Sequence, residues 1–440
     1  MKNTAITVKG VLSSIIAKMA QSPQQYVKNP ESDFTRKRSL SFETVMKFII
    51  SMGGNSIYKE LLEAQDYSTE TVSSSAFVQQ RDKILPSAFE FLFRSFTDTH
   101  TVIELFSGYR LFAFDGSDLR IPTNPNDPET YTQNKPDTKG YNHLHLNALY
   151  DLQNRIYVDA IIQPRMMINE HKALVETVER SQVNDKVILI ADRGLESYNN
   201  FAHIEQKGWN YVIRVKDLRS NGILSGLSLP SDGEFDINFD LILTKKHTKT
   251  VRENRGIYKF ISSTAKFDFL DNTSNLFYPM SFRVVRIRLD NGSYETLITN
   301  LCESEFSPSE LKHIYKLRWG IETSFRELKY TIGLTSFHAK KRESIIQEIF
   351  ARMTMYNFTA IITSHVIIEK SDKKHDYKIN FTIAVHICRR FIRFYGNEPP
   401  LDVEALIRKN IVPLRPIRKN RYDRGKIRSK SFVSFVYRVA

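Results

Sequence analysis

Hydrophobic residues in the first hundred positions recur with the period of a helix. The segments "SFETVMKFIISM" and "SIYKELLEAQ" have apolar residues at helical spacing, which predicts two amphipathic helices. Ser41 can cap the first helix, and the Gly53-Gly54 pair separates it from the second. We therefore expect residues 1–100 to be all-helical.

From Tyr109 onwards, short apolar or alternating runs are separated by helical segments. In order, residues 101–216 predict three strands, a helix, a strand, a second helix and a final strand. Such a succession predicts an α/β fold, in which helices pack on a mixed sheet.

Strand-like segments then follow one another without helices up to about residue 293. One of them contains Asn291-Gly292, a pair typical of a tight β-hairpin turn. We therefore expect residues 217–300 to be a β-rich insertion. The α/β pattern resumes over residues 301–370, with one long helix that is predicted to begin at Ser307-Pro308 and to run towards Ile332.

Positive charge is concentrated at the C-terminal end of the chain. The chain has 440 residues and a formal net charge of +14, which predicts an acidic partner. Most of the excess lies in residues 371–440, where 17 Lys and Arg stand against 6 Asp and Glu. The segment "RPIRKNRYDRGKIRSK" is typical of an extended arm that follows phosphates, although a solvated basic tail is the alternative. A shorter basic segment, "FTRKRSL", is either a DNA contact or a charged surface.

The hydropathy pattern argues against a membrane protein. No uninterrupted apolar stretch approaches the roughly 18 residues that suggest a membrane span. The N-terminal segment has short apolar runs broken by Ser and Lys, which is not the pattern of a secretory signal. We expect a cytoplasmic protein with no membrane partner.

The long helix carries a stripe of polar residues beside its apolar face. On a regular helix these residues share a stripe about 60° wide, and they are Tyr315, Arg318, Glu322 and Lys329. Glu322 is therefore expected at the edge of a core. Taken alone, the stripe also fits ion pairs four residues apart, worth a few tenths of a kcal/mol.

Two further carboxylates suggest more than ion pairing. Asp115 and Asp192 each follow an apolar strand and precede a Gly-containing turn, so both are predicted at strand ends, where α/β sites are built. Either one alone could be a turn residue. Together with Glu322, however, they would repel one another unless divalent cations compensate, and oxygen ligands suit magnesium or manganese.

Other side chains compete for the same role. His143 and His145 share one face of an alternating strand and could ligate a metal with Asp115, or could simply be strand residues near the site. Asp118 is an alternative to Asp115, which the strand-end position favours.

The spacing Y-x2-R-x3-E-x6-K resembles the signature of the insertion-sequence transposases of the IS-four family. It is formed by Tyr315, Arg318, Glu322 and Lys329. The resemblance includes "DGS" at Asp115, "DRG" at Asp192 and the strand "LITNL" before the helix, and it extends from about Phe34 to the C-terminus.

This resemblance implies an RNase H-like catalytic core with an N-terminal helical DNA-binding domain and a β-rich insertion. The basic region 371–440 would serve dimer or DNA-end contacts. Two magnesium or manganese ions would be bridged by Asp115, with Asp192 and Glu322 each holding one. Phosphates would be bound by Tyr315, Arg318 and Lys329.

The implied activity is transposition of an insertion sequence. Two-metal-ion hydrolysis and transesterification would excise and integrate the element by cut-and-paste, through hairpin ends. The implied partners are double-stranded DNA, as terminal inverted repeats and target, and a second copy in the synaptic complex. Such a prokaryotic protein would be nucleoid-associated when bound. The alternatives are an RNase H-like nuclease without strand transfer and a basic DNA-binding protein without catalysis.

One departure from the family concerns base flipping. Some members use a Trp in the insertion to hold a flipped base. The tryptophans here are Trp209, before the insertion, and Trp319, in the long helix. Phe277 or Tyr278 is the candidate for that role.

Overall fold

The structure is a computed structural model that describes residues 4–36, 39–100, 104–133, 135, 137–218, 220, 222–271, 273, 275–368, 376–393 and 401–414. The basic segment 415–430 lies outside the described residues, as do residues 37 and 38 of the shorter basic segment. Within the described residues, no helix combines the length and apolarity needed to cross a membrane.

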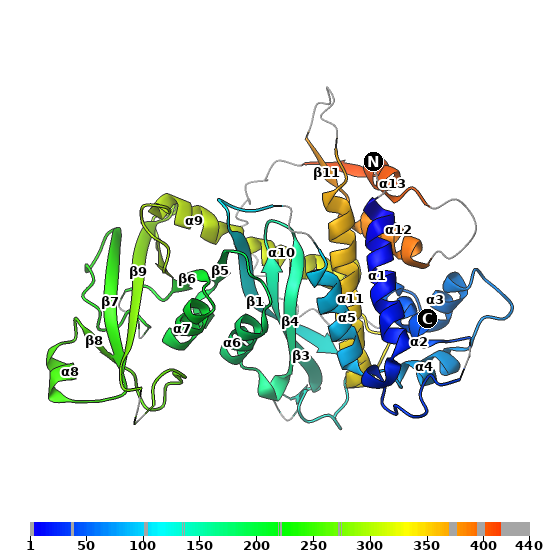
Figure 1. Cartoon of the computed structure of the whole chain (residues 1–440), viewed down its shortest axis with the longest axis horizontal. Coiled ribbons are helices and arrows are strands. Elements are labelled where there is room, and N and C mark those ends of the chain that lie inside the picture. The colour runs from blue at the N-terminus through cyan, green and yellow to red at the C-terminus, as the bar shows by residue number, and fades with distance from the viewer. Residues whose placement is uncertain are drawn as a thin grey trace.

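Helices from both ends of the chain share one core at one end of the molecule (Figure 1). Ser41 caps α2, as predicted, by accepting a hydrogen bond from the Thr44 amide. The N-terminal helices are α1 (Thr4–Gln21), α2 (Phe42–Ser51), α3 (Ile57–Ala64), α4 (Ser74–Arg81) and α5 (Pro86–Asp98). They pack with α11 (Arg342–Ser364) and α12 (Phe381–Arg393), near which lie α13 (Val403–Lys409) and the short pair β11 (Tyr377–Ile379) and β12 (Ile411–Pro413).

The predicted alternation of strands and helices forms the middle of the molecule. In chain order its elements are β1 (Arg110–Ile121), β2 (Tyr131–Thr132), β3 (Tyr141–Asp151), β4 (Ile156–Pro164), α6 (Glu170–Arg180), β5 (Val187–Ala191), α7 (Tyr198–Gln206) and β6 (Asn210–Val215). The main strands lie in the order β4-β3-β1-β5-β6. β3 runs antiparallel to β1 and β4, whereas β1, β5 and β6 are parallel. The mixed α/β fold class is therefore confirmed.

The strands of the predicted insertion extend this same sheet. They are β7 (Phe235–Thr244), β8 (Tyr258–Phe260), β9 (Tyr278–Arg288) and β10 (Tyr294–Thr299), with the short helix α8 (Lys249–Glu253) between the first two. β10 pairs with β6, and β9, β7 and β8 follow outwards. The predicted hairpin turn is confirmed between β9 and β10, where Gly292 has a positive φ of 82°.

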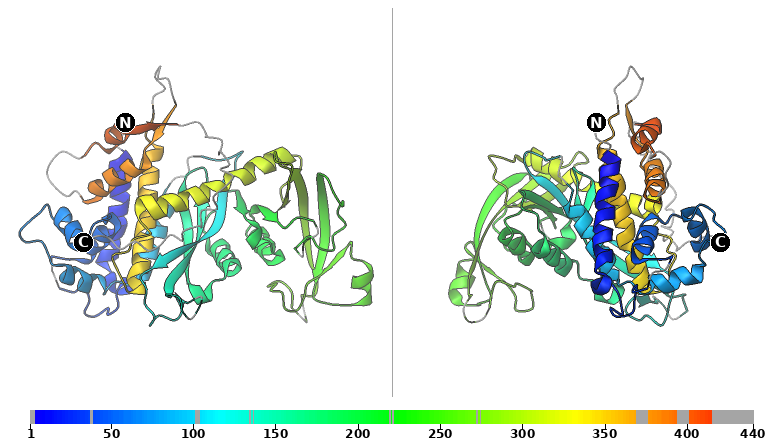
Figure 2. Two further views of the ribbon diagram at one scale, coloured as in Figure 1. Left: turned by 180° about the vertical axis from the view of Figure 1, so that it is seen from behind. Right: turned by 45° about the vertical axis from the view of Figure 1, so that its right-hand side comes forward.

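Alternate residues of β1 point to opposite faces of the sheet, and each face has its own helices. Phe112 and Phe114 pack in the core that α6 and α7 cover. Leu111 and Ala113 face the other side, where the helices are α9 (Pro308–Leu317), α10 (Trp319–Arg326) and, farther along, α11. The left view of Figure 2 shows α9 and α10 crossing this second face.

The long helix begins and ends where the sequence predicts. Ser307 and Glu310 form a capping box at its start, and Gly333, with a φ of 96°, follows its last residue, Ile332. Two irregularities were not foreseen. The helix is interrupted at Arg318, between α9 and α10, and its last part, Glu327–Ile332, is π-helical. The uniform 100° per residue used for the polar stripe therefore does not hold as far as Lys329.

Candidate active site

Two aspartates lie side by side where the parallel strands β1 and β5 part. The last residues that pair between these strands are Phe114 and Ala191, and Asp115 and Asp192 follow them directly. One detail of the prediction is wrong: β1 does not end at Asp115 but continues to Ile121, because β3 still pairs with it. Only the β5 side of β1 becomes free beyond this point.

The third carboxylate, Glu322, comes from α10 and lies near Asp115. The Arg318 guanidinium lies between Glu322 and Asp115, with Nη2 2.8 Å from Glu322 Oε1 and Nη1 3.6 Å from Asp115 Oδ2. The ion pair between Arg318 and Glu322 that the spacing allowed is therefore present. Arg318 also contacts Asp115, which belongs to the sheet. Arg318 is only 5% exposed, so this contact belongs to the interior rather than to a solvated surface.

Asp192 is held by groups from two other elements. The Tyr315 hydroxyl donates to Asp192 Oδ1 over 3.1 Å, and Arg214 Nη1 on β6 lies 4.0 Å from the same oxygen. The Nε of Arg214 is also 3.5 Å from Glu295 Oε1 on β10. Sequence reasoning missed Arg214 and Glu295, because they alternate normally within their strands and only the pairing of β6 with β10 brings them here.

Lys329 is the signature residue that the structure keeps apart from the carboxylates of the site. Within the described residues it makes no ion pair with Asp115, Asp192 or Glu322. Burial lowers the pKa of Lys329, while the charge of nearby Asp118 acts in the opposite direction. The amine is thus half-buried near the site, close to Asp118 on β1.

The surroundings of Asp115 disfavour its ionised form. Burial raises the pKa of Asp115 to about 6, and the negative charges of Glu322 and Glu170 add to that effect. The Gly116 amide and Arg318 act in the opposite direction but do not outweigh it. Burial likewise raises the pKa of Glu295, followed by the charge of Asp192. The surroundings of Asp115 and Glu295 therefore disfavour the charged forms of these two side chains.

A divalent cation fits the donor chemistry of this site. Carboxylate oxygens are what magnesium and manganese prefer, and the raised pKa of Asp115 marks a place where added positive charge would be favourable. Within the described residues, however, no three His, Cys, Asp or Glu side chains are grouped closely enough to hold a metal ion as they stand. Arg318 now occupies the space between Asp115 and Glu322.

The histidines form a separate cluster and do not join Asp115, contrary to one of the predicted options. His145 Nδ1 is 2.7 Å from Asp118 Oδ1, and its Nε2 is 2.9 Å from Glu170 Oε1. Burial disfavours the imidazolium, but the hydrogen bonds to these carboxylates outweigh it and raise the pKa of His145 to about 9. His143 lies 4.0 Å from Asp118. Asp118 is therefore engaged by histidine, which leaves Asp115 as the carboxylate beside Arg318.

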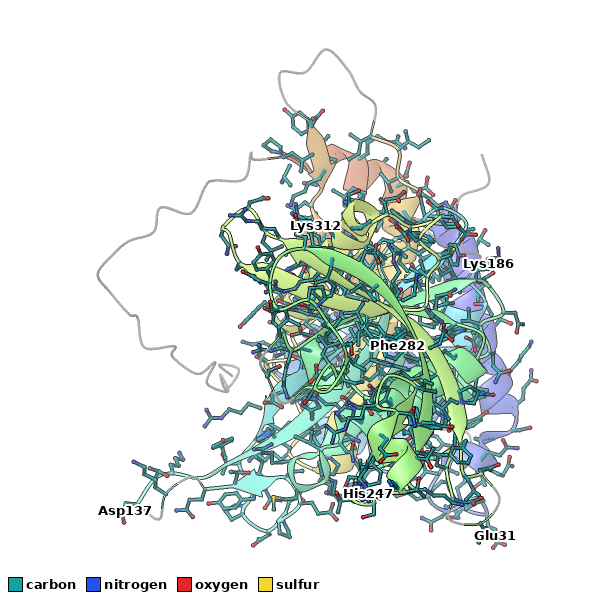
Figure 3. All side chains as sticks on the ribbon, turned by 90° about the vertical axis from the view of Figure 1, so that its left-hand side faces the viewer. Glu31, Asp137, Lys186, His247, Phe282 and Lys312 are labelled. Atoms are coloured by element: carbon teal, nitrogen blue, oxygen red, sulfur yellow. The ribbon has the colours of Figure 1, made fainter. Side chains whose placement is uncertain are left out.

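The aromatic candidates for holding a base lie at the far end of the insertion. Tyr278 begins β9 and pairs with Leu243, whereas Arg288, at the other end of β9, accepts a hydrogen bond from Lys312 on α9. Figure 3 shows His247 and Lys312 at opposite ends of the insertion, with Phe282 between them. Phe277 and Tyr278 are thus at the end of β9 away from α9 and the carboxylates.

Trp319 lies much nearer to the carboxylates than either of these residues. It is 61% exposed, and its ring is 5.6 Å from the Arg318 guanidinium carbon. Trp209, in contrast, is buried against Phe112.

Comparison of the chain with known proteins shows which family it resembles. Residues 106–358 match the Transposase DDE domain family, and this range contains Asp115, Asp192 and Glu322. A putative transposase, InsL, for insertion sequence element IS186A of Escherichia coli (strain K12) is 36% identical over 72 residues, which are 16% of this chain and 20% of that protein. The transposase for insertion sequence element IS421 of Escherichia coli is also 36% identical over 72 residues, 16% of this chain and 19% of its own length.

The matched segment thus spans about a fifth of these curated relatives. Among solved structures, a piggyBac transposase synaptic complex with hairpin DNA aligns with 94% of this chain and 86% of its own, at 10% identity and a TM-score of 0.44. The family match covers more than half of the 440 residues. This chain therefore belongs to the DDE-domain transposase family.

Proposed function

We propose that this protein is an insertion-sequence transposase of the IS-four family, with Asp115, Asp192 and Glu322 as its catalytic carboxylates. The observation that carries the proposal is that Asp115 and Asp192 lie where β1 and β5 part, and that the buried Arg318 joins Asp115 to Glu322. Tyr315, from the same signature, donates to Asp192. Residues of the signature helix thus contact two aspartates that lie far from them in the sequence.

The strand order supports an RNase H-like core. Three antiparallel strands followed by two parallel ones, in the order β4-β3-β1-β5-β6, are what that fold requires. On this proposal residues 101–216 and 301–370 form the core, residues 217–300 are the insertion, and residues 1–100 bind DNA. The basic region 371–440 then serves contacts with DNA ends or with a second copy.

The chemistry proposed is phosphodiester cleavage and strand transfer. Two magnesium or manganese ions, held by the three carboxylates, would supply activation of a water or 3′-hydroxyl and stabilisation of the leaving oxygen. Asp115, Asp192 and Glu322 would be the residues that hold these ions, as the family resemblance implies. The three carboxylates are partly exposed, whereas the Arg318 beside them is almost fully buried, so a substrate and metal ions could reach the carboxylates from solvent.

Three side chains of the signature are proposed to position DNA. The planar fork of Arg318 suits two phosphate oxygens, and the Lys329 amine is a mobile point charge near Asp118. The Tyr315 hydroxyl, now donating to Asp192, would orient that carboxylate or a phosphate. The substrates proposed are the terminal inverted repeats of the element and its target DNA, bound by a homodimer.

The finer mechanism proposed is cut-and-paste through hairpin ends. The test is incubation of the protein with magnesium and a plasmid that carries the element's own ends. Hairpin-ended fragments, followed by joined products when target DNA is added, are the expected result. Linear unsealed ends would contradict the hairpin step, and cleavage without any joined product would instead favour a nuclease without strand transfer.

A DNA-binding protein without catalysis is the second candidate. It is favoured by the ion pairs that Arg318 makes with Asp115 and Glu322, since these alone could account for the carboxylates. Such a protein would bind the plasmid but leave it uncut at every magnesium concentration.

A further inference from the structure

Arg318 is placed where a cation serving the site would have to bind. Its guanidinium contacts carboxylates from two different elements, Asp115 on β1 and Glu322 on α10. It is almost fully buried, and its carbon lies 5.7 Å from the Tyr315 ring and 5.6 Å from the Trp319 ring, within cation–π range. A single positive charge is therefore held between two of the three carboxylates.

The same guanidinium is not fully satisfied. Its Nε is shielded from solvent but has no hydrogen-bond partner in the part of the chain that the structure describes. A buried donor without a partner is costly, so an additional acceptor would bind there favourably. A phosphodiester offers two acceptor oxygens in the geometry that an arginine fork matches.

The backbone around Arg318 also departs from a regular helix. Its amide bonds to the Tyr315 carbonyl and its own carbonyl accepts from the Ile321 amide, both over three residues instead of four. Such a short 3₁₀-type stretch inside a helix marks a point where the chain can change its direction. Arg318 thus sits at the one interruption between α9 and α10.

We infer that Arg318 occupies the cation position in the DNA-free protein and thereby keeps divalent ions out until a DNA phosphate draws the guanidinium away. A divalent ion between Asp115 and Glu322 would compete with Arg318 for the same oxygens. DNA removes this competitor, so DNA binding and metal binding strengthen each other by the same factor. This inference rests on the proposed role of the three carboxylates as metal ligands.

The test is the affinity for Mn²⁺, measured by electron paramagnetic resonance with and without a short DNA duplex. Without DNA, Arg318→Ala and Arg318→Gln should bind Mn²⁺ at least about tenfold more tightly than wild type, because a like charge within about 4 Å is removed. DNA should raise the Mn²⁺ affinity of wild type and leave that of both variants nearly unchanged. Arg318→Lys keeps the positive charge and should behave like wild type.

Lys329→Gln is the matched control. It removes a positive charge from the same helix, but from a residue that makes no ion pair with Asp115 or Glu322 within the described residues. Its effect on Mn²⁺ affinity should be several times smaller than that of Arg318→Gln. Equal effects would reduce the inference to general electrostatics and overturn it.

Two outcomes separate this inference from the proposed function. If Arg318→Ala and Arg318→Gln bind Mn²⁺ no better than wild type while Glu322→Gln loses binding, the carboxylates are ligands but Arg318 is no competitor. If Glu322→Gln binds Mn²⁺ as wild type does, with and without DNA, the proposed metal site itself is wrong. Circular dichroism of each variant shows whether it is folded.

Discussion

At the scale of single residues, Asp115 shows the cost of building a site that needs negative charge. Its ordinary pKa of 3.8 is raised to about 6, first by burial and then by Glu322 and Glu170. Between pH 3.8 and about pH 6, the folded protein therefore binds more protons at Asp115 than the unfolded chain does. Stability contributed by the group falls as pH rises from about 4 to 6, and the cost is fully present at pH 7.

Asp115→Asn should accordingly stabilise the metal-free protein at pH 7. A shift of about two units corresponds to roughly 3 kcal/mol, which we reduce to about 1–2 kcal/mol because the side chain retains some contact with water. Thermal unfolding in EDTA at pH 7 and pH 4 measures the difference, which should vanish at pH 4. Asp290→Asn, fully exposed in the β9–β10 turn, is the control. A variant that is less stable than wild type at pH 7 would contradict this explanation.

The sequence identifies single residues of the site where a local pattern marks them, such as a position after an apolar strand or a spacing along one helix. Tyr315, Arg318 and Glu322 lie on one helix, so their spacing already predicts a common stripe, and they do meet at the two aspartates. Arg214 and Glu170 carry no comparable signal. They reach the site through strand pairing and helix packing between segments far apart in the chain, which no local pattern encodes.

At the scale of elements, the site depends on how closely β1, β3 and α6 approach one another. At Gly116 a Cβ atom would lie 2.3 Å from His145 Nε2 and 2.7 Å from Glu170 Oε1. Both atoms belong to the cluster in which His145 contacts Asp118 and Glu170, so neither can move without breaking those contacts. Gly116 thus allows α6 and β3 to support the strand that carries Asp115.

Gly116→Ala should therefore destabilise the protein by about 1–3 kcal/mol, as overpacking in a well-packed interior does. The lowered melting temperature should be accompanied by loss of DNA cleavage, because the neighbouring Asp115 would shift. Gly10→Ala is the matched control: nothing lies within 4 Å of a Cβ at Gly10 in α1, and alanine favours a helix. If the Gly116→Ala protein were as stable as the Gly10→Ala protein, the packing of His145 and Glu170 against Gly116 would not be tight.

Element boundaries were predictable where a local signal sets them, and internal irregularities were not. Ser41 and Ser307 cap helix starts, and Gly333 follows a helix end with a positive φ. These residue types are typical of such positions, so the sequence alone indicates the boundaries. The interruption at Arg318 and the π-helical end of the same helix have no such signal. They depend on how the helix packs against the sheet and against α11, which is a tertiary property.

At the scale of the whole molecule, two long-range connections define the architecture. The insertion strands continue the central sheet through β10, and the N-terminal helices share a core with α11 and α12. The sequence predicts β-rich and helical regions but not these partners, since pairing over such distances has no local pattern. A buried network joins α4 to α11: Arg81 Nη1 is 3.0 Å from Glu348 Oε1, with both side chains almost fully buried.

Arg81→Met should weaken this connection strongly. It leaves Glu348 buried with Arg352 as its remaining arginine partner, and breaking a buried pair from one side typically costs about 3–5 kcal/mol. We expect a lower melting temperature and faster proteolysis of the N-terminal helices. The control is Arg155→Met, whose ion pair with Glu327 is 60% exposed on the arginine side and should cost less than about 1 kcal/mol. Equal melting temperatures for the two variants would refute the importance of this network.

The central claim is that Asp115, Asp192 and Glu322 together cut DNA. The measurement that tests it most directly is magnesium-dependent cleavage of a plasmid carrying the element's ends by Asp115→Asn, Asp192→Asn and Glu322→Gln, with DNA binding measured in parallel. Each variant should lose cleavage by at least about a thousandfold while still binding DNA, whereas Glu303→Gln, an exposed control, should cut normally. Cleavage at wild-type rate by any of the three variants would contradict the account.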